Sequence, residues 1–224
     1  MILVAFMIIP YSDNPQWFSA AGQIYFDFGV NSSDTNYQTY ENSSAGVRIK
    51  YPSGWSLLEN LGNVSGNYIL ADFYLSGIQG SHGYSENANV IVMNRSEDVE
   101  SLKKDYLDTS GSSFAIQPTK AITTEADVSA FTKYLVNETL DPIIAELSKT
   151  FGNVTLLQSI PTVISGSPGH EITYQITNDQ TNAKHTQAWT FQKGNWYVVT
   201  YSAQPPAYYS PATAINIISS LVIS

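Results

Sequence analysis

The sequence of 224 residues contains no cysteine, and this absence removes several kinds of chemistry at once. Disulfide bonds, thiolate metal sites and cysteine nucleophiles are all excluded. A chain of this length buries roughly 70% of its unfolded surface, so it does not need such a cross-link to be stable. Charged residues are scarce too, at 13%, and the net charge is −9. Because nucleic acid is bound by basic surfaces, we do not expect a nucleic-acid partner.

The chain also lacks a hydrophobic run long enough to cross a bilayer, which needs about 20 residues. Residues 2–9 form an apolar run of the length found in signal peptides, and small residues follow at 18–21. No basic residue precedes the run, and an upstream start missing from this copy would account for this. A buried β-strand is the alternative interpretation. We interpret residues 1–20 as a signal-peptide-like segment, 21–39 as a polar tether and 40–224 as a single domain.

Asparagine, serine, threonine and tyrosine are abundant, which is typical of extracellular proteins. Six asparagines begin an N-x-Ser/Thr sequon and are candidate glycosylation sites: Asn31, Asn42, Asn63, Asn94, Asn137 and Asn153. A chain of this composition produces some sequons by chance. Together with the N-terminal apolar run, they predict a secreted or cell-surface glycoprotein.

Residues 169–205 predict a meander of three β-strands. Apolar and polar residues alternate before and after a polar turn at 178–182, as in half-buried strands. Lys193-Gly194 has the composition of a two-residue hairpin turn. This turn predicts that Phe191 faces Trp196 and that Trp189 faces Val198, as part of a buried ladder. Residues Tyr197, Val199 and Tyr201 then share the opposite face, which forms either a second core or an aromatic cleft.

The remaining elements alternate between strands and helices. The pattern predicts strands at 45–51, 67–77, 88–94 and 153–164, and helices at 96–108, 124–135 and 141–151. A C-terminal helix begins at Ser210-Pro211, with Ile215, Ile218 and Val222 predicted to face inward. We therefore expect an α+β fold, in which helices sandwich a central antiparallel β-sheet.

Several motifs, in order and spacing, resemble the PsbP-like family over residues 40–224. They are the GVRIKYP sequence at 46–52 with Trp55, the NVIV sequence at 89–92, the GSPG sequence at 166–169, and NWYVVTYSA at 195–203. The resemblance implies the α-β-α fold of that family and a non-enzymatic role in binding to or assembling larger complexes. Its members include an extrinsic lumenal subunit of photosystem II and a relative that binds a small nuclear GTPase. This chain departs from the pattern by an inserted region at 97–124.

No cofactor is expected, and candidate metal ligands are few. His82 and Glu86 lie close together in a connection and form the strongest candidate for a divalent cation such as zinc or manganese. The turn at 178–182 offers oxygen ligands suited to calcium, although an ordinary polar turn explains it as well. The proposed register puts His185 opposite Ile176, away from His170, so these two histidines are not expected to share a metal.

No catalytic motif is present, because the chain has neither a GxSxG sequence nor a glycine-rich phosphate loop. We therefore predict an exported, non-enzymatic PsbP-like binding or assembly module. It would be a monomer that acts as an extrinsic accessory subunit of a membrane or cell-envelope complex, with a protein partner and peripheral membrane association. The alternatives are a carboxylate- or metal-dependent hydrolase and a purely structural cell-surface domain.

Overall fold

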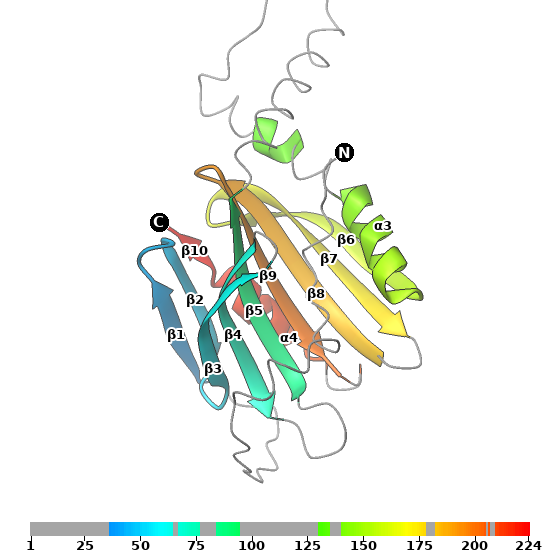
Figure 1. Cartoon of the computed structure of the whole chain (residues 1–224), viewed down its shortest axis with the longest axis horizontal. Coiled ribbons are helices and arrows are strands. Elements are labelled where there is room, and N and C mark those ends of the chain that lie inside the picture. The colour runs from blue at the N-terminus through cyan, green and yellow to red at the C-terminus, as the bar shows by residue number, and fades with distance from the viewer. Residues whose placement is uncertain are drawn as a thin grey trace, which may run out of the picture.

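The computed structural model describes residues 36–64, 67–76, 84–94, 130–134, 140–177, 182–204, 206 and 209–224. Two antiparallel sheets dominate them: a seven-stranded sheet in the order β3-β4-β5-β9-β8-β7-β6 and a three-stranded sheet in the order β1-β2-β10 (Figure 1). The elements are β1 (Tyr37–Asn42), β2 (Val47–Pro52), β3 (Ser56–Val64), β4 (Asn67–Ser76), β5 (Tyr84–Asn94), α3 (Leu140–Phe151), β6 (Val154–Ile164), β7 (Ser167–Thr177), β8 (Asn182–Gln192), β9 (Asn195–Ala203), α4 (Pro211–Ser219) and β10 (Val222–Ile223).

Two tight hairpin turns set the register of the large sheet. Lys193 and Gly194 have φ of 52° and 80°, the paired positive values of a type I′ turn. The register that follows pairs Phe191 with Trp196 and Trp189 with Val198, which confirms the predicted ladder. Ser165 and Gly166, with φ of 49° and 80°, make a second such turn between β6 and β7.

One face of the seven-stranded sheet packs against α3 and the helical residues 130–134. We call its apolar cluster the α3-side core: Ile69, Ile91, Met93, Phe131, Ile143, Leu147, Ile172, Tyr174, Ile176, Trp189, Trp196 and Val198. Trp189, Tyr174 and Leu147 are fully buried there. The prediction that Trp189 and its neighbours form core is therefore confirmed.

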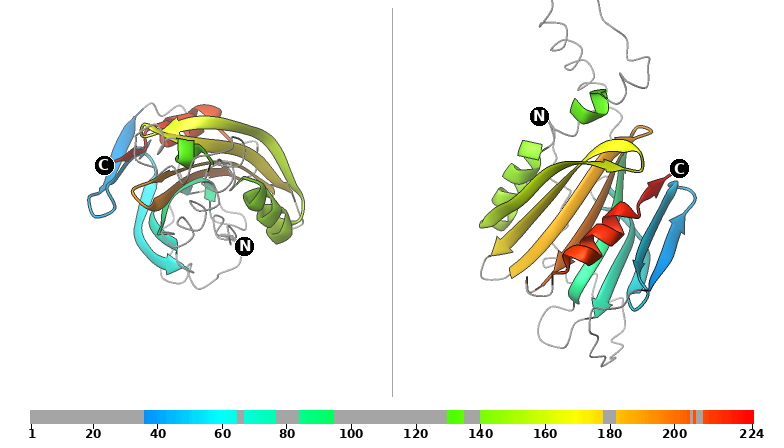
Figure 2. Two further views of the ribbon diagram at one scale, coloured as in Figure 1. Left: turned by 90° about the horizontal axis from the view of Figure 1, so that it is seen from above. Right: turned by 180° about the vertical axis from the view of Figure 1, so that it is seen from behind.

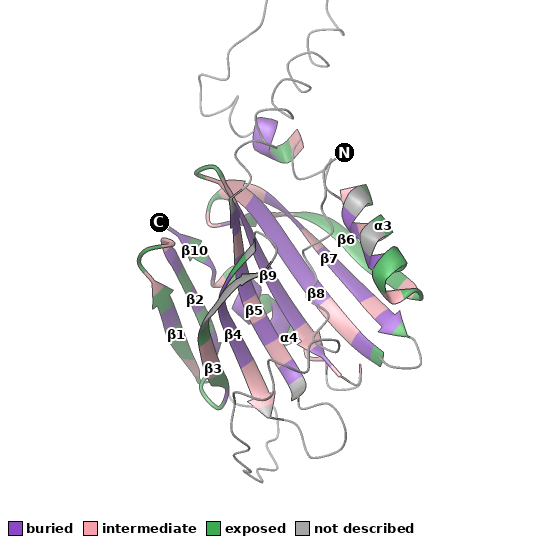
Figure 3. Ribbon diagram, viewed as in Figure 1, coloured by how far each residue is buried: buried purple, intermediate pink, exposed green. Residues whose placement is uncertain are grey.

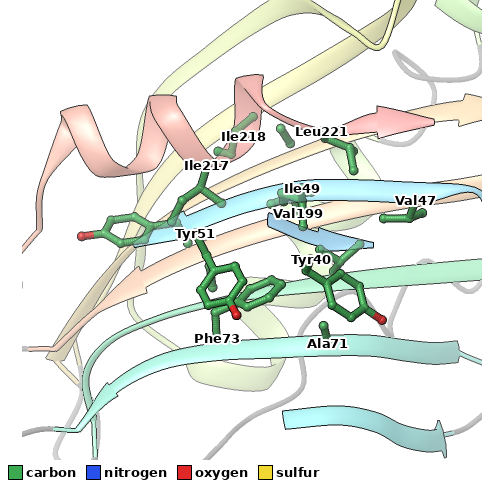
Figure 4. Close-up of a cluster of buried hydrophobic side chains, with 14 of the residues drawn as sticks. Tyr40, Val47, Ile49, Tyr51, Ala71, Phe73, Val199, Ile217, Ile218 and Leu221 are labelled. Carbon is green, nitrogen blue, oxygen red and sulfur yellow. The ribbon is translucent and has the colours of Figure 1, made fainter. Parts of the chain in front are cut away.

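The opposite face corrects the predicted fold class. It is covered by α4 together with the three-stranded sheet, so the described part of the chain is mostly β and the predicted α-β-α sandwich is wrong (Figure 2). The reason lies in β2, because Val47, Ile49 and Tyr51 are all buried on one side of this strand. Strands β1 and β10 pair with β2 and form hydrogen bonds with its backbone. Tyr51 stacks on Phe73 of β4 with ring centroids 4.4 Å apart, as Figure 4 shows. The face that carries Tyr197, Val199 and Tyr201 is therefore a second core and not an aromatic cleft, and it is covered mainly by strands.

Of the three residues predicted to face inward from the C-terminal helix, only Ile218 is buried in α4. Ser210 caps the helix by accepting a hydrogen bond from the Thr213 backbone N–H, which confirms the predicted start. The buried residues are Ala214, Ile217 and Ile218, whereas Ile215 is 59% exposed. The helix ends at Ser219, so Val222 lies in β10 and is not a helical core residue.

The other predicted strands and the helix at 141–151 correspond to β2, β4, β5, β6 and α3. Strands β1 and β3 were not predicted, because their polar residues obscure the alternation. The predicted helix at 96–108, the N-terminal segment 1–20 and the start of the helix at 124–135 lie outside the described residues.

Strand β6 forms one edge of the large sheet and contains a proline in its interior. Ile164 and Ser167 flank the tight turn and therefore form a hydrogen-bonded pair, as do Ile160 and Glu171 by alternation. Pro161 pairs with His170 between them, so its nitrogen points away from β7, toward the free edge. This direction explains why a proline is tolerated within the strand, since no ladder hydrogen bond is lost.

Replacement of Trp189 by alanine tests the α3-side core. Trp189→Ala removes a fully buried side chain and leaves a cavity, so we expect a loss of about 3–5 kcal/mol in the free energy of unfolding. Chemical denaturation measures it, with Ile215→Ala on the exposed face of α4 as the control. An unchanged midpoint for Trp189→Ala would contradict the assignment.

Replacement of Pro161 tests its role at the sheet edge. Pro161→Val restores an outward N–H on a strand that carries no charged residue, so we expect increased self-association at high protein concentration. Thr162→Val is the matched control, because the N–H of Thr162 points toward β7. Light scattering that rises equally in both variants, or in neither, would argue against a protective role for the proline.

Candidate functional site

Polar side chains gather at one end of the α3-side face of the large sheet. Two neighbouring rows run across the strands there, which we call the inner row (Asp72, Asn89, Thr200 and Gln187) and the outer row (Tyr74, Asn87, Ser202, His185 and Tyr174). They continue the same face as Ile91, Val198 and Trp189, since alternate residues of a strand share a face. The face is therefore apolar near the Lys193–Gly194 turn and polar at its other end.

Hydrogen bonds connect neighbouring strands within these rows. The Gln187 amide Nε2 donates to Thr200 Oγ1 at 3.1 Å, and Asn87 Nδ2 donates to Asp72 Oδ1 at 3.3 Å. His185 Nδ1 lies 2.8 Å from Ser202 Oγ. These contacts fix the orientation of the side chains across four strands.

Three polar atoms of the rows are buried and have no hydrogen-bond partner among the described residues: Asn89 Oδ1, Tyr174 OH and His185 Nε2. The rings of Tyr174 and His185 stack with centroids 4.9 Å apart. Burial lowers the pKa of His185 to about 4, so its imidazole is neutral at pH 7, and burial raises the pKa of Tyr174. Each such atom costs roughly 1–3 kcal/mol unless a water or ligand meets it.

Glu86, a predicted metal ligand, lies on the opposite face of the sheet. It is buried, and its Oε1 accepts a hydrogen bond of 2.7 Å from the Tyr201 hydroxyl. Burial raises the pKa of Glu86, and the Tyr201 hydroxyl partly offsets this. The Tyr201 oxygen in turn accepts from the Ser210 backbone N–H, which links Glu86 to the start of α4. His82 lies outside the described residues, so the His82–Glu86 metal site stays a prediction.

Tyr209, which precedes α4, extends this second polar group. The Lys184 ammonium lies 4.1 Å from the centre of the Tyr209 ring, and the Tyr209 hydroxyl hydrogen-bonds to Thr186. Thr186 also bonds to Thr173 on β7, at 2.9 Å. The described parts of the chain contain no cluster of three or more metal-binding side chains. The turn at 178–182, which was considered as a calcium site, lies almost entirely outside the described residues.

The two described histidines occupy separate positions, as predicted. His170 Nε2 lies 2.7 Å from Ser159 Oγ on β6, and its ring contacts Trp189. His185 lies opposite Tyr174 and not opposite Ile176, so the predicted register at this turn is wrong by two residues. The error arose because the turn between β7 and β8 is longer than two residues and does not fix a register by itself.

The candidate glycosylation sites differ in their surroundings. Asn153 is exposed just before β6, whereas the Asn42 side chain accepts hydrogen bonds from Ser44 and the Ala45 backbone in a turn. Asn63 and Asn94 lie in β3 and β5. Asn31 and Asn137 are outside the described residues. Glycosylation at all six stays a prediction.

The polar rows were missed by the sequence analysis, although one signal was present. Gln187 and His185 continue the alternation of Trp189 and Phe191, which places two polar residues on a face predicted to be buried. A buried polar position in a strand requires a partner, and this marks a site. Their partners on β5 and β9 are distant in sequence, and only the fold brings them together.

Comparison with known proteins supports the fold but names no family. No protein-family model matches the sequence, and no curated protein matches it. The solution structure of cyanobacterial PsbP (CyanoP) from Synechocystis sp. PCC 6803 is similar, at 15% identity and a TM-score of 0.50, covering 90% of this chain and 99% of that chain. LpqN, involved in cell envelope biogenesis of Mycobacterium tuberculosis, aligns at 10% identity and a TM-score of 0.44, covering 84% and 91%. The likeness to the PsbP structure shows a shared fold.

None of the described helices combines the length and the hydrophobicity that a membrane span requires.

The buried imidazole of His185 predicts a pH-dependent stability. Its pKa is lowered from 6.5 to about 4 on folding, so between these pH values His185 is protonated in the unfolded chain and neutral in the folded chain. Above pH 6.5 His185 is neutral in both states, and its titration does not change the free energy of unfolding. As the pH falls toward 4, protonation of His185 in the unfolded chain lowers the free energy of unfolding by up to about 3 kcal/mol.

His185→Gln keeps a hydrogen-bonding group but cannot be protonated in this range. We expect the variant to lose less stability than the parent between pH 6.5 and 4, in urea titrations at several pH values. Comparison of the two proteins isolates His185, because Glu86 and His170 titrate in both. Parallel curves would contradict a buried neutral imidazole.

Proposed function

We propose that the protein is an exported, non-enzymatic, PsbP-like binding module that docks on a larger membrane or cell-envelope complex as an accessory subunit. The observation that carries this proposal is the surface of β6, which is exposed along most of its length (Figure 3). Four large apolar side chains are exposed on it: Leu156 at 41%, Leu157 at 50%, Ile160 at 38% and Val163 at 72%. Grouped apolar exposure of this kind is typical of interaction surfaces.

The composition of β6 supports docking at this edge. None of its eleven residues is charged, although the chain as a whole carries a net charge of −9. Exposed edge strands usually carry charges that discourage contact with other proteins. The apolar side chains therefore suit a partner with a matching apolar patch, and the acidic remainder of the surface favours basic residues around that patch.

The docking is expected to use side chains more than backbone hydrogen bonds. Pro161 has no N–H to offer at the free edge, and an irregular register between Leu156 and Gln158 interrupts the strand again. A partner strand that paired with the free edge of β6 would therefore find its backbone hydrogen bonding interrupted at two places. Leu156 and Val163 lie on the side of β6 that faces α3, and Ile160 lies on the other, so the partner would contact both sides of the edge.

The non-enzymatic part of the proposal rests on the sequence, which contains neither a GxSxG motif nor a glycine-rich phosphate loop. The carboxylate of Glu86 is also buried and already accepts a hydrogen bond from Tyr201. The resemblance to the PsbP-like family and the PsbP-like fold support the accessory role, and the N-terminal apolar run and the sequons support export.

Capture from detergent-solubilised membranes of the source organism tests the proposal. Tagged parent protein and Ile215→Lys, an exposed apolar site on α4, should retain the same partner, whereas Val163→Lys should lose most of it because a charge enters the apolar edge. Quantitative mass spectrometry measures the recovery, and thermal melting confirms that both variants fold. Equal recovery with Val163→Lys and Ile215→Lys would rule out β6 as the docking surface.

A further inference from the structure

The outer and inner rows contain more hydrogen-bonding capacity than the described residues satisfy. Asn89 Oδ1, Tyr174 OH and His185 Nε2 are each buried without a partner, and they come from β5, β7 and β8. Tyr174 has no exposed surface at all. Three such atoms in two neighbouring rows of one sheet are unusual, because nearly all buried polar groups in proteins are paired.

The residues of the two rows differ in how far they are buried. Asp72, Gln187 and Thr200 in the inner row are almost completely buried. Asn87, Ser202 and His185 in the outer row and Asn89 in the inner row are half-buried, whereas Tyr174 in the outer row is completely buried. The seven-stranded sheet is curved and this face is on the inside of the curve, with α3 (Figure 2). Tyr174 and His185, whose rings stack, lie in the outer row, and Asn89 lies in the neighbouring inner row on the same face.

The side chains select the chemistry of such a molecule. Neither row contains lysine or arginine, and the only acidic residue is Asp72, so the rows offer no positive charge to an anion. Asn89 Oδ1 needs a donor, whereas the Tyr174 hydroxyl and the neutral imidazole of His185 each donate or accept. A hydroxyl group meets both requirements at once, since it donates one hydrogen bond and accepts others.

We propose that Asn89, Tyr174 and His185 form a binding site for a small uncharged molecule that carries several hydroxyl groups. This site is separate from the β6 edge and does not depend on the proposed docking role. Gln187 and Thr200 hold the floor of the site through their mutual hydrogen bond, and Ser202 orients the imidazole from its Nδ1 side.

Two tyrosine variants give a matched test of the protein without a ligand. Tyr174→Phe removes a hydroxyl that has no protein partner, so the melting temperature should stay the same or rise. Tyr201→Phe removes a hydroxyl that donates to Glu86 and accepts from the Ser210 backbone, so the melting temperature should fall. A similar fall in both variants would show that the Tyr174 hydroxyl already has a partner, and would overturn the proposal.

Titration with glycerol, glucose and inorganic phosphate tests the chemistry of the site. NMR signals of the His185 ring and the Asn89 amide should shift saturably with at least one of the two polyols and not with phosphate. The affinity should weaken at least about fivefold in Tyr174→Phe, as the loss of one hydrogen bond predicts, and stay unchanged in Tyr201→Phe. No saturable shift with either polyol, saturation by phosphate, or equal affinity in the two variants would each overturn the proposal.

Discussion

The register of the β8–β9 hairpin is the constraint on which the rest of the structure depends. A two-residue turn at Lys193-Gly194 leaves only one pairing of the flanking strands, and that pairing decides which residues share a face. A shift by a single residue would exchange Trp189, Trp196 and Val198 with Tyr197 and Ala188. Both cores would then face the wrong layer. The aromatic ladder stabilises the same register through side-chain contacts, so the turn and the core specify one arrangement.

Sequence reasoning succeeded where geometry is local and failed where it is not. The tight turn could be recognised from Lys193-Gly194, and the buried ladder followed from it by alternation. The β7–β8 connection contains more residues than a tight turn needs, and counting along the chain placed His185 two residues away from its true partner. The second sheet was not predicted at all, because β10 is two residues long and pairs with β2 across most of the sequence. No local pattern reports such a contact.

The candidate site shows the same limit in a different form. Each polar residue of the two rows looks like an ordinary strand residue, and none belongs to a motif. Asn89 and Thr200 become neighbours only because β5 and β9 pair in the middle of the sheet. What the sequence did contain was a conflict, since Gln187 and His185 occupy positions that the alternation predicts to be buried. Such conflicts between local pattern and burial are expected at functional or strained sites.

The two candidate surfaces, the β6 edge and the polar rows of the α3-side face, are unfavourable for stability in opposite ways. At β6, apolar side chains meet water while Pro161 and the irregular register near Leu157 limit what the backbone of the edge can pair with. On the α3-side face, polar atoms are withdrawn from water without complete pairing. A fold selected only for stability would tend to exchange the two, with apolar residues on the inner face and polar residues along the edge. The protein has both exposed apolar side chains on β6 and unpaired buried polar atoms in the rows, although each lowers its stability. This combination is the argument for binding at each of the two surfaces.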